Sequence, residues 1–239
     1  MIRTIWFALN LLVATIPLSL LVIAGSYAGA KSRFYDRIPR WWARWLLWAA
    51  AVRVDVEGVD NLALDRAQII VANHVSWFDV LALASKTPKR YRFVAKQELG
   101  RIPLFGHAWR AAGHISVDRS DNARAVASLR QAGDTIRHDN SSIIIFPEGT
   151  RSRTGELQPF KKGAFVLALH NAIDIVPAAV LGTHRIMPKD SWRVRAGRII
   201  VRFGPPIPTA GADISGRDEL IARVRAQMQQ LLARPARID

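Results

Sequence analysis

The 239-residue sequence contains no cysteine. Disulfide bonds, thiolate metal sites and a cysteine nucleophile are therefore excluded. The six histidines are scattered along the chain, and none has the spacing of a metal-binding motif such as His-Glu-x-x-His. We accordingly expect neither a protein-bound metal nor a cofactor.

Acidic residues are few, because 19 Asp and Glu accompany 34 Lys and Arg and leave a formal net charge of +15. A surplus of this size is typical of proteins that bind nucleic acid, an anionic membrane surface, or phosphorylated and CoA-like substrates. Part of it can reflect coding bias, since arginine outnumbers lysine 27 to 7. No helix-turn-helix, zinc-finger or RRM signature accompanies the charge, so we predict no nucleic-acid partner.

Charged residues are absent from positions 4–30, a run of 27 residues. As a helix this run would be about 40 Å long, more than the ~30 Å hydrocarbon core of a bilayer requires. Pro17 lies near its middle and permits a kink, so the segment could cross the bilayer or enter one leaflet and return. A cleaved signal peptide is the competing interpretation, because Ala28-Gly29-Ala30 resembles a cleavage site.

We favour a retained membrane anchor over a signal peptide. Only Arg3 precedes the run, and the run is longer than the hydrophobic region of a normal signal peptide. Basic residues crowd its downstream side and hold that side in the cytoplasm; they are Lys31, Arg33, Arg37, Arg40 and Arg44. We therefore expect the protein at the bacterial inner (cytoplasmic) membrane, with the part of the chain after this run on the cytoplasmic side.

Tryptophan is concentrated just after this run, where positions 41–48 hold four of the eight residues of this type. Pro39 suits the start of a helix there. On that helix Trp41, Trp45 and Trp48 share one face. Indole rings and long arginine side chains are favoured at the headgroup level of a bilayer, which predicts an interfacial helix. An aromatic helix packed into a protein core is the alternative.

From residue 52 onward, short apolar runs alternate with amphipathic stretches. We expect strands at 52–56, 68–72, 91–96, 114–117, 142–146 and 175–181, and a hairpin at 194–203 that turns at Ala196-Gly197. Helices are expected at 79–85, 97–112 with a break near Pro103, 122–137, 162–171 and 219–233. This alternation predicts an α/β fold: one layered domain at 52–239 with a largely parallel sheet flanked by helices. Residues 1–51 would form a separate membrane-associated helical segment.

The first candidate for chemistry is Asn73-His74-Val75-Ser76-Trp77-Phe78-Asp79, between a predicted strand and a predicted helix. If His74 lies in the loop and Asp79 on the first helical turn, the two side chains can meet. A neutral imidazole can remove a proton from a hydroxyl near pH 7, and a carboxylate on its other nitrogen fixes the tautomer. The alternative is that Ser76-x-x-Asp79 is a capping box that only starts the helix.

Basic residues follow three of the predicted strands. They are Lys96, Arg119, and Arg151 in the stretch Phe146-Pro147-Glu148-Gly149-Thr150-Arg151-Ser152. Glycine permits close backbone approach to a ligand, and the planar guanidinium of Arg151 suits a phosphate. Each basic residue alone is more often a solvated surface charge, and the glycine stretch alone could be an ordinary turn. Because three basic residues follow strands, as His74 does, we nevertheless infer that they share one anion-binding site.

Four ordered blocks of the sequence resemble the 1-acylglycerol-3-phosphate acyltransferase family, the lysophosphatidate acyltransferases. They are Asn-His-x4-Asp at 73–79, Gly-x5-Arg at 113–119, Phe-Pro-Glu-Gly-Thr-Arg-Ser at 146–152, and the apolar run at 176–180. The third block is highly specific, and the four together span about residues 70–185. Ser116 departs from the family pattern, which usually has an aromatic or other bulky residue there.

The resemblance implies transfer of a fatty acyl group from acyl-CoA or acyl carrier protein to the sn-2 hydroxyl of 1-acyl-sn-glycerol 3-phosphate, which gives phosphatidic acid. His74 would be the general base and Asp79 its orienting partner. The other candidate residues would bind the acceptor, with Lys96, Arg119 and Arg151 at its phosphate and Glu148, Gly149 and Thr150 shaping its site. Direct attack on the thioester in a ternary complex is expected, and Ser76 as a covalent nucleophile is the less favoured route.

Other functions stay open at this point. The acceptor could be lyso-ornithine lipid or another lysophospholipid. A non-catalytic peripheral membrane protein that binds anionic lipid would use the basic surface and the tryptophan helix, but it has no need of His74 and Asp79. A lipid hydrolase is disfavoured because the sequence has no Gly-x-Ser-x-Gly motif.

Overall fold

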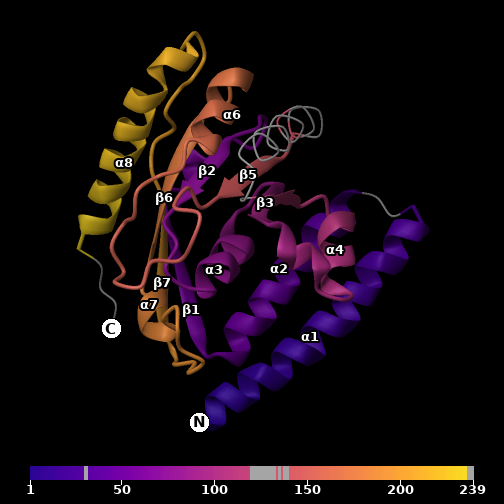
Figure 1. The fold of residues 1–239 in the computed structure, drawn as a ribbon. Helices are drawn as coiled ribbons and strands as arrows, with labels where there is room; N and C mark the ends of the chain where they lie inside the picture. Colours follow the sequence, from indigo (N-terminus) through magenta and orange to yellow (C-terminus); the bar gives the residue numbers. More distant parts are fainter. Residues whose placement is uncertain (30–31, 119–132, 134–135, 137–139, 236–239) are drawn as a thin grey trace.

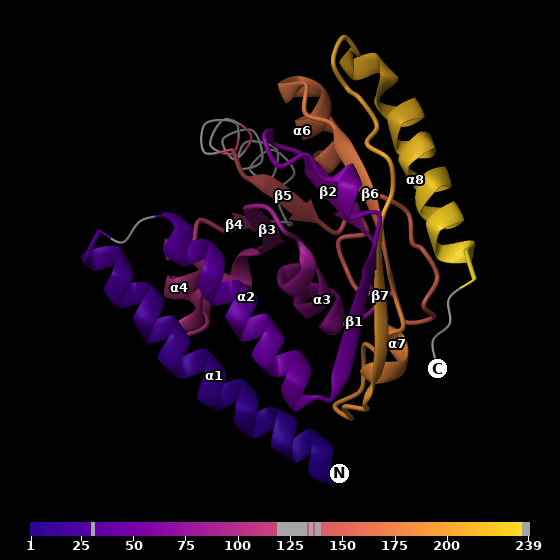
Figure 2. The same ribbon diagram turned by 180° about the vertical axis from the view of Figure 1, so that it is seen from behind.

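A seven-stranded sheet with helices on both faces forms the centre of the computed structural model, which describes residues 1–29, 32–118, 133, 136 and 140–235 (Figures 1 and 2). The strand order is β1-β7-β6-β2-β5-β3-β4, and every neighbouring pair is parallel except β6 and β7. The predicted α/β fold with a largely parallel sheet is confirmed. The strands are β1 (Val52–Glu57), β2 (Ile69–Ala72), β3 (Tyr91–Lys96), β4 (Ile115–Val117), β5 (Ser142–Ile145), β6 (Ile175–Leu181) and β7 (Gly197–Phe203).

Two long helices precede the sheet, and shorter ones connect its strands. The α-helices are α1 (Ile2–Tyr27), α2 (Ser32–Ala49), α3 (Phe78–Lys86), α4 (Phe105–Ala111), α6 (Gly163–Asn171), α7 (Thr183–Ile186) and α8 (Arg217–Ala233). Short 3-10 helices occur at η1 (Val59–Asn61), η2 (Gln97–Arg101) and η3 (Ile214–Gly216). The predicted break near Pro103 is the boundary between η2 and α4.

The central strands are buried on both faces, which explains why they read as continuous apolar runs. Along β2, Ile70 and Ala72 pack in the core that includes α2 and α3. Ile69 and Val71 pack in the opposite core, with α6 and α8. Successive side chains of a strand point to opposite faces, so a short apolar strand serves both cores.

The direction of the strands decides which loops meet. The carboxyl ends of β2, β3, β4, β5 and β6 lie at one edge of the sheet, because these strands run parallel. We call this the carboxyl edge. Since β7 is antiparallel to β6 and parallel to β1, both β7 and β1 begin at the same edge. The loops that leave the parallel strands therefore meet the segments that enter β1 and β7.

The expected hairpin at 194–203 is wrong. Residues 197–203 form the single strand β7, which lies between β1 and β6, and residues 191–196 have no regular structure. Val194 is buried, and its N–H donates to Thr4 Oγ1 at the start of α1 (3.1 Å). Part of this stretch does form a strand, but the strand pairs with β1 and β6, which are distant in sequence, and not with its own neighbouring residues. The local pattern therefore suggested a turn that does not exist.

The predicted start of a helix at Pro39 is also wrong, because α2 begins at Ser32 and Pro39 lies inside it. A proline in a helix interior removes one backbone hydrogen bond. The first turns of α2 are held instead by the buried Asp36, which forms ion pairs with Arg92 on β3 and with Arg90 just before that strand, each at 2.9 Å. The expected helix at 122–137 falls almost entirely outside the described residues.

Helix α1 packs lengthwise on the rest of the molecule and is long and apolar enough, by length and composition, to cross a membrane. Its inner side contacts α2 and α4, and Trp42 and Trp45 of α2 donate to Thr15 Oγ1 and Asn10 Oδ1, both at 2.9 Å. Phe7 contacts Phe78 of α3, with 5.4 Å between ring centroids and 32° between the ring planes. The outer face of α1 is exposed and apolar, and its residues are Ile2, Ile5, Trp6, Leu9, Leu12, Val13, Ile16, Leu20 and Leu21.

Candidate active site

His74 and Asp79 meet at the carboxyl edge. His74 follows β2, Asp79 lies on the first turn of α3, and Nδ1 of the imidazole is 2.9 Å from Oδ2 of the carboxylate. The Asp79 side chain is fully buried, while that of His74 is 17% exposed. The two residues therefore have the geometry that the sequence predicted, with the histidine in the loop and the aspartate on the helix.

Asp79 also bonds the backbone at the start of α3, as the capping-box interpretation predicted. Its Oδ2 accepts hydrogen bonds from the backbone N–H groups of Val75 (2.7 Å) and Ser76 (2.8 Å). The Ser76 hydroxyl oxygen in turn accepts from Phe78 N (3.2 Å). The bond from Ser76 N to Asp79 is the one that a capping box makes, while the Ser76 hydroxyl accepts from Phe78 N rather than from Asp79 N. One carboxylate thus fixes both the start of the helix and the orientation of the imidazole.

Ser76 has a structural role in this arrangement. Its hydroxyl donates to the backbone oxygen of Met187, 2.7 Å away, and the residue is fully buried. The hydroxyl is therefore engaged away from the exposed side of His74, which does not favour a covalent route through Ser76.

Thr183 is a partner of the pair that the sequence did not reveal. It begins α7, directly after β6, and its fully buried hydroxyl donates to Asp79 Oδ1 at 2.6 Å. Oδ2 has the three other donors, so Thr183 controls the second oxygen of the carboxylate. The only signal in the sequence was its position two residues after an apolar strand that ends at the carboxyl edge.

The imidazole is held from one face as well as from Nδ1. The ring of Phe146, which follows β5, stacks on it with 4.0 Å between ring centroids and 16° between planes. Among the described residues, Nε2 of His74 has no hydrogen-bond partner. Since the side chain is partly exposed, Nε2 is the atom that can receive a proton from a bound hydroxyl.

The 146–152 block fixes the backbone of His74 on both sides. Glu148 Oε1 accepts from His74 N, and Ser152 N donates to His74 O, each at 2.7 Å. Glu148 Oε2 accepts from Gln158 N at 3.1 Å. Burial, with a smaller contribution from the nearby Asp79, raises the pKa of Glu148 to about 7, although the two N–H donors and Arg225 act to lower it. The Glu148 carboxyl therefore contacts the backbone of His74 and not its imidazole.

Asn73 anchors the loop that carries His74. Its side-chain amide donates to Val180 O (3.0 Å) and accepts from Val180 N (2.7 Å). The side chain thereby extends the pairing of β2 with β6 by one step beyond the strand. The asparagine of the first sequence block has a defined structural function that spacing alone could not show.

The predicted cations occupy different environments. Lys96 is exposed and paired with Glu98 (2.7 Å), whereas Arg119 lies outside the described residues. The guanidinium of Arg151 lies 5.5 Å from the centroid of the Trp77 ring, and its Nη1 donates to Lys189 O at 3.2 Å. Arg151 is thereby linked to the loop that carries His74.

Two further lysines surround the turn at Gly149, which has a left-handed backbone (φ +73°). The side chain of Lys161 crosses this glycine so closely that a Cβ atom there would lie 2.7 Å from Lys161 Cε. Lys189 Nζ donates to Thr150 Oγ1 at 3.3 Å. The turn at 149–151 therefore carries more cationic groups than the sequence analysis assigned. No group of three or more metal-ligating side chains occurs among residues that the structure describes.

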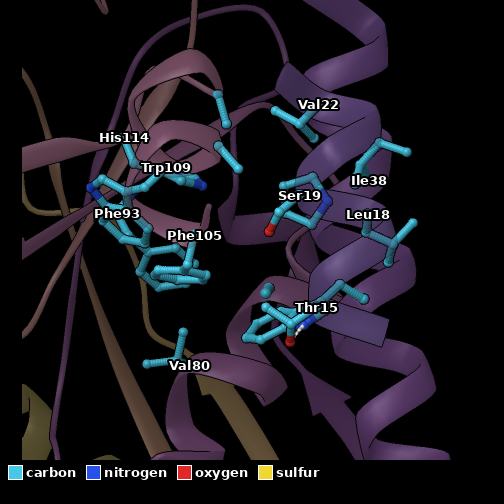
Figure 3. Close-up of a pocket in the computed structure, with 15 residues that line it drawn as sticks. Thr15, Leu18, Ser19, Val22, Ile38, Val80, Phe93, Phe105, Trp109 and His114 are labelled. Atoms are coloured by element: carbon cyan, nitrogen blue, oxygen red, sulfur yellow. Dashed lines mark hydrogen bonds between the residues drawn. The ribbon is translucent and has the colours of Figure 1, made fainter. Parts of the chain in front are cut away.

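An apolar cavity lies beside the site, between α1 and α2 on one side and β3 and α4 on the other (Figure 3). Thr15 and Ser19 line it from α1, and Phe93, Trp109 and His114 line it from the opposite side. The ring of Phe93 lies parallel to that of Phe146 at 6.5 Å, and Phe146 stacks on His74. The Phe146 ring therefore lies between His74 and a wall of the cavity.

Comparison with known proteins identifies similar chains. The profile of a family described as Acyltransferase matches residues 53–181. The chain is 39% identical over 166 residues to a 1-acyl-sn-glycerol-3-phosphate acyltransferase of Cocos nucifera, covering 70% of this chain and 53% of the relative. It is 33% identical over 177 residues to 1-acyl-sn-glycerol-3-phosphate acyltransferase alpha of Bos taurus, covering 74% and 62%. The chain thus spans between half and two thirds of these curated relatives.

A solved structure resembles the whole described fold. The crystal structure of the 1-acyl-sn-glycerophosphate acyltransferase PlsC from Thermotoga maritima superposes with a TM-score of 0.82 at 25% sequence identity. The superposition covers 99% of this chain and 97% of that one. The likeness therefore includes the two N-terminal helices as well as the sheet.

The raised pKa of Glu148 predicts a pH-dependent stability. A group whose pKa is higher in the folded state contributes stability that is present below its ordinary pKa of 4.5 and is lost as the pH rises through about 7. Thermal denaturation in detergent should therefore show the wild type losing melting temperature relative to Glu148→Gln across this range. Glu98→Gln is the matched control, because Glu98 is exposed and hydrogen-bonding to Lys96 lowers its pKa. A wild-type advantage that grows with pH would mean that the two N–H donors outweigh burial.

Proposed function

Because the chain belongs to the acyltransferase family, we propose that it transfers a fatty acyl group from acyl-CoA or acyl carrier protein to the sn-2 hydroxyl of 1-acyl-sn-glycerol 3-phosphate, giving phosphatidic acid. The observation that carries the proposal is the fixed pair of His74 and Asp79, in which Nδ1 is bonded to a buried carboxylate and Nε2 is left for a substrate. The names of the similar proteins support this substrate.

The two ring nitrogens of His74 have different roles in the proposed reaction. Nε2 of His74 removes the proton of the sn-2 hydroxyl as the oxygen attacks the thioester carbonyl carbon. The tetrahedral intermediate then collapses, the carbon–sulfur bond breaks, and the departing sulfur takes the proton from Nε2. Asp79 stabilises the imidazolium that exists between these steps. No covalent enzyme intermediate is required.

Thr183 acts by positioning Asp79. The hydrogen bond to Oδ1 keeps the carboxylate from rotating, so that Oδ2 faces the imidazole. A buried carboxylate oxygen that has lost its hydrogen-bond donor is strongly disfavoured, so without Thr183 the Asp79 carboxylate would rotate toward other donors. The orientation of Nε2 toward the acceptor hydroxyl therefore depends on Thr183 through Asp79.

The acceptor phosphate would bind at the cationic turn. We assign it to Arg151, together with Lys96 and Arg119, while Gly149 and Thr150 shape the surface on which it lies. Arg151 is preorganised for this purpose by its contacts with Trp77 and Lys189 O. Glu148 acts on the same site indirectly, through the backbone of His74.

Membrane attachment would come from residues 1–51, with residues 52–239 forming the catalytic domain. The exposed apolar face of α1 suits lipid, and the exposed fractions of Trp41, Trp45 and Trp48 on α2 are 57%, 40% and 67%. Because α1 packs along the protein over its length, we place it in one leaflet beside the catalytic domain rather than across the bilayer. The proposed location is the cytoplasmic side of the bacterial inner membrane.

The apolar cavity would receive the acyl chain of the donor. The chain of the acceptor can remain in the bilayer, whereas that of the donor must leave its carrier and be shielded from water. The cavity is lined almost wholly by apolar groups and is adjacent to the aromatic layer against His74. Its depth would then limit the length of the transferred chain.

Replacing the general base tests the function directly. His74→Ala should lower acyl transfer by about 10²- to 10⁴-fold while the protein stays folded, because the base is removed from a loop position. The assay offers purified protein a labelled acyl-CoA and lysophosphatidate, with lyso-ornithine lipid and other lysophospholipids as competing acceptors, and separates the lipid products. His170→Ala, at an exposed histidine of α6, is the control. Activity of His74→Ala within a few-fold of wild type would refute the assignment.

Thr183 can be tested by a pair of substitutions. Thr183→Val keeps the shape but removes the hydroxyl, and small displacements of catalytic groups cost up to about 100-fold in rate. We expect kcat to fall by about 10- to 100-fold with the KM of both substrates nearly unchanged, and Thr183→Ser to restore most of the rate. Equal rates in the valine and serine variants would show that the hydroxyl only contributes packing.

The cavity predicts opposite changes in chain-length preference. Ala108→Phe fills the cavity from α4 and should shift the products toward shorter transferred chains, whereas Phe105→Ala enlarges it and should permit longer ones. Mass spectrometry of the products formed from a mixture of acyl donors gives the ratio within one sample, so a general loss of activity does not affect the result. Shifts in the same direction for both variants would contradict the proposed cavity.

A further inference from the structure

The segment of residues 188–196, between α7 and β7, carries an exposed aromatic side chain among cations. Trp192 is 88% exposed, and Arg193 and Arg195 beside it are also exposed. Exposed apolar residues are common on protein surfaces and mean little by themselves. The position of this segment gives the side chain its significance.

One end of the segment is tied to the N-terminal helices. Val194 is buried, and its N–H donates to Thr4 Oγ1 on the first turn of α1 (3.1 Å). Gly197 N donates to Ala51 O, just after α2, at 3.4 Å. Both ribbon views show the chain's N-terminus close to α7 and the start of β7 (Figures 1 and 2). Trp192 therefore belongs to the corner where α1 begins and α2 ends.

The same corner already carries exposed aromatic rings. Trp6 of α1 and Trp48 of α2 contact each other edge to face, with 6.3 Å between ring centroids, and both remain exposed. Trp6 belongs to the outer face of α1. The segment at 188–196 thus meets α1 and α2 at the end where these helices carry exposed tryptophans.

The other end of the segment contacts the candidate active site. Met187 O, just before it, accepts from Ser76 Oγ at 2.7 Å. Lys189 O accepts from Arg151 Nη1, and Lys189 Nζ donates to Thr150 Oγ1. A single short stretch therefore contacts both the helices proposed to enter lipid and the residues proposed to bind the acceptor phosphate.

We propose that residues 188–196 form an additional membrane contact, in which Trp192, Arg193 and Arg195 lie in the headgroup region of an anionic phospholipid bilayer. The contact holds Lys189, and with it Arg151 and Thr150, at the level where the phosphate of a membrane-embedded acceptor lies. Indole rings favour this region, and each basic side chain near an anionic surface adds attraction. This inference rests on the proposed membrane attachment of α1 and α2.

The attachment of this segment to the start of α1 and the end of α2, both proposed to lie in the membrane, favours lipid over a protein partner. A tryptophan between arginines would also suit a protein interface. An acidic carrier protein could therefore bind the same segment, and the experiment distinguishes the two. The chain offers a matched control in the loop between β1 and β2, at the opposite edge of the sheet, where Leu64 is 67% exposed and the side chain of Arg66 is 61% exposed.

A fluorescent probe tests the contact without using activity. The natural chain has no cysteine, so Ser191→Cys and Leu64→Cys each give one labelling position. After labelling with an environment-sensitive dye and reconstitution in phosphatidylcholine–phosphatidylglycerol vesicles, lipids spin-labelled near the headgroup should quench the dye at 191 and not at 64. Equal quenching at both positions would overturn the proposal, as would a response at 191 to acyl carrier protein but not to vesicles.

Kinetics test the consequence for the acceptor. Trp192→Ala, and Arg193→Ala combined with Arg195→Ala, should each raise the apparent KM for vesicle-borne lysophosphatidate by about three- to tenfold. Activity on a short-chain, water-soluble acceptor should stay within about twofold, and Leu64→Ala and Arg66→Ala should change neither. Equal losses on both acceptors would overturn the proposal. A wild-type protein that is inactive on every acceptor would refute the proposed function, while the quenching result would still report on the membrane contact.

Discussion

The carboxylate of Asp79 is the group on which the candidate site depends. It is fully buried and accepts four hydrogen bonds, from two backbone N–H groups, the imidazole of His74 and the hydroxyl of Thr183. A buried charge is costly unless such partners surround it. Because the donors come from the loop after β2 and from α7, the carboxylate is stable only when these parts have assembled. The geometry of the candidate site is thus a product of the complete fold.

The order and direction of the strands bring those parts together. Parallel strands deliver the loops after β2, β5 and β6 to one edge, where the block at 146–152 holds the backbone of His74 at both its N–H and its C=O. The reversal of β7 adds a second consequence. It makes β1 and β7 begin at this edge, so the end of α2 and the segment before β7 are brought beside the site. A single antiparallel pairing therefore brings the loops of the candidate site close to the helices that face outward.

The sequence predicted those features that depend on local pattern. Apolar runs located the strands β1 to β6, and the position of Asp79 one turn into a helix predicted its contact with His74. The roles of Asn73, Ser152 and Thr183 were not predictable, because their bonding partners lie between 78 and 107 residues away. The false hairpin at 194–203 has the same origin. Its apolar residues pair with β1 and β6 and pack on α1, and no local rule encodes those distant neighbours.

The two sides of α1 differ in a way that restricts how it can meet a membrane. On its inner side, Asn10 and Thr15 accept hydrogen bonds from Trp45 and Trp42, and Ser19 faces the apolar cavity. On its outer side the side chains are apolar and exposed. Lipid around the whole circumference would remove the partners of the polar side chains, which is unfavourable in a hydrocarbon environment. A helix of this kind is suited to lie between protein and lipid. Since α1 also forms one wall of the cavity, its proposed position in the membrane and the proposed binding of an acyl chain depend on the same packing.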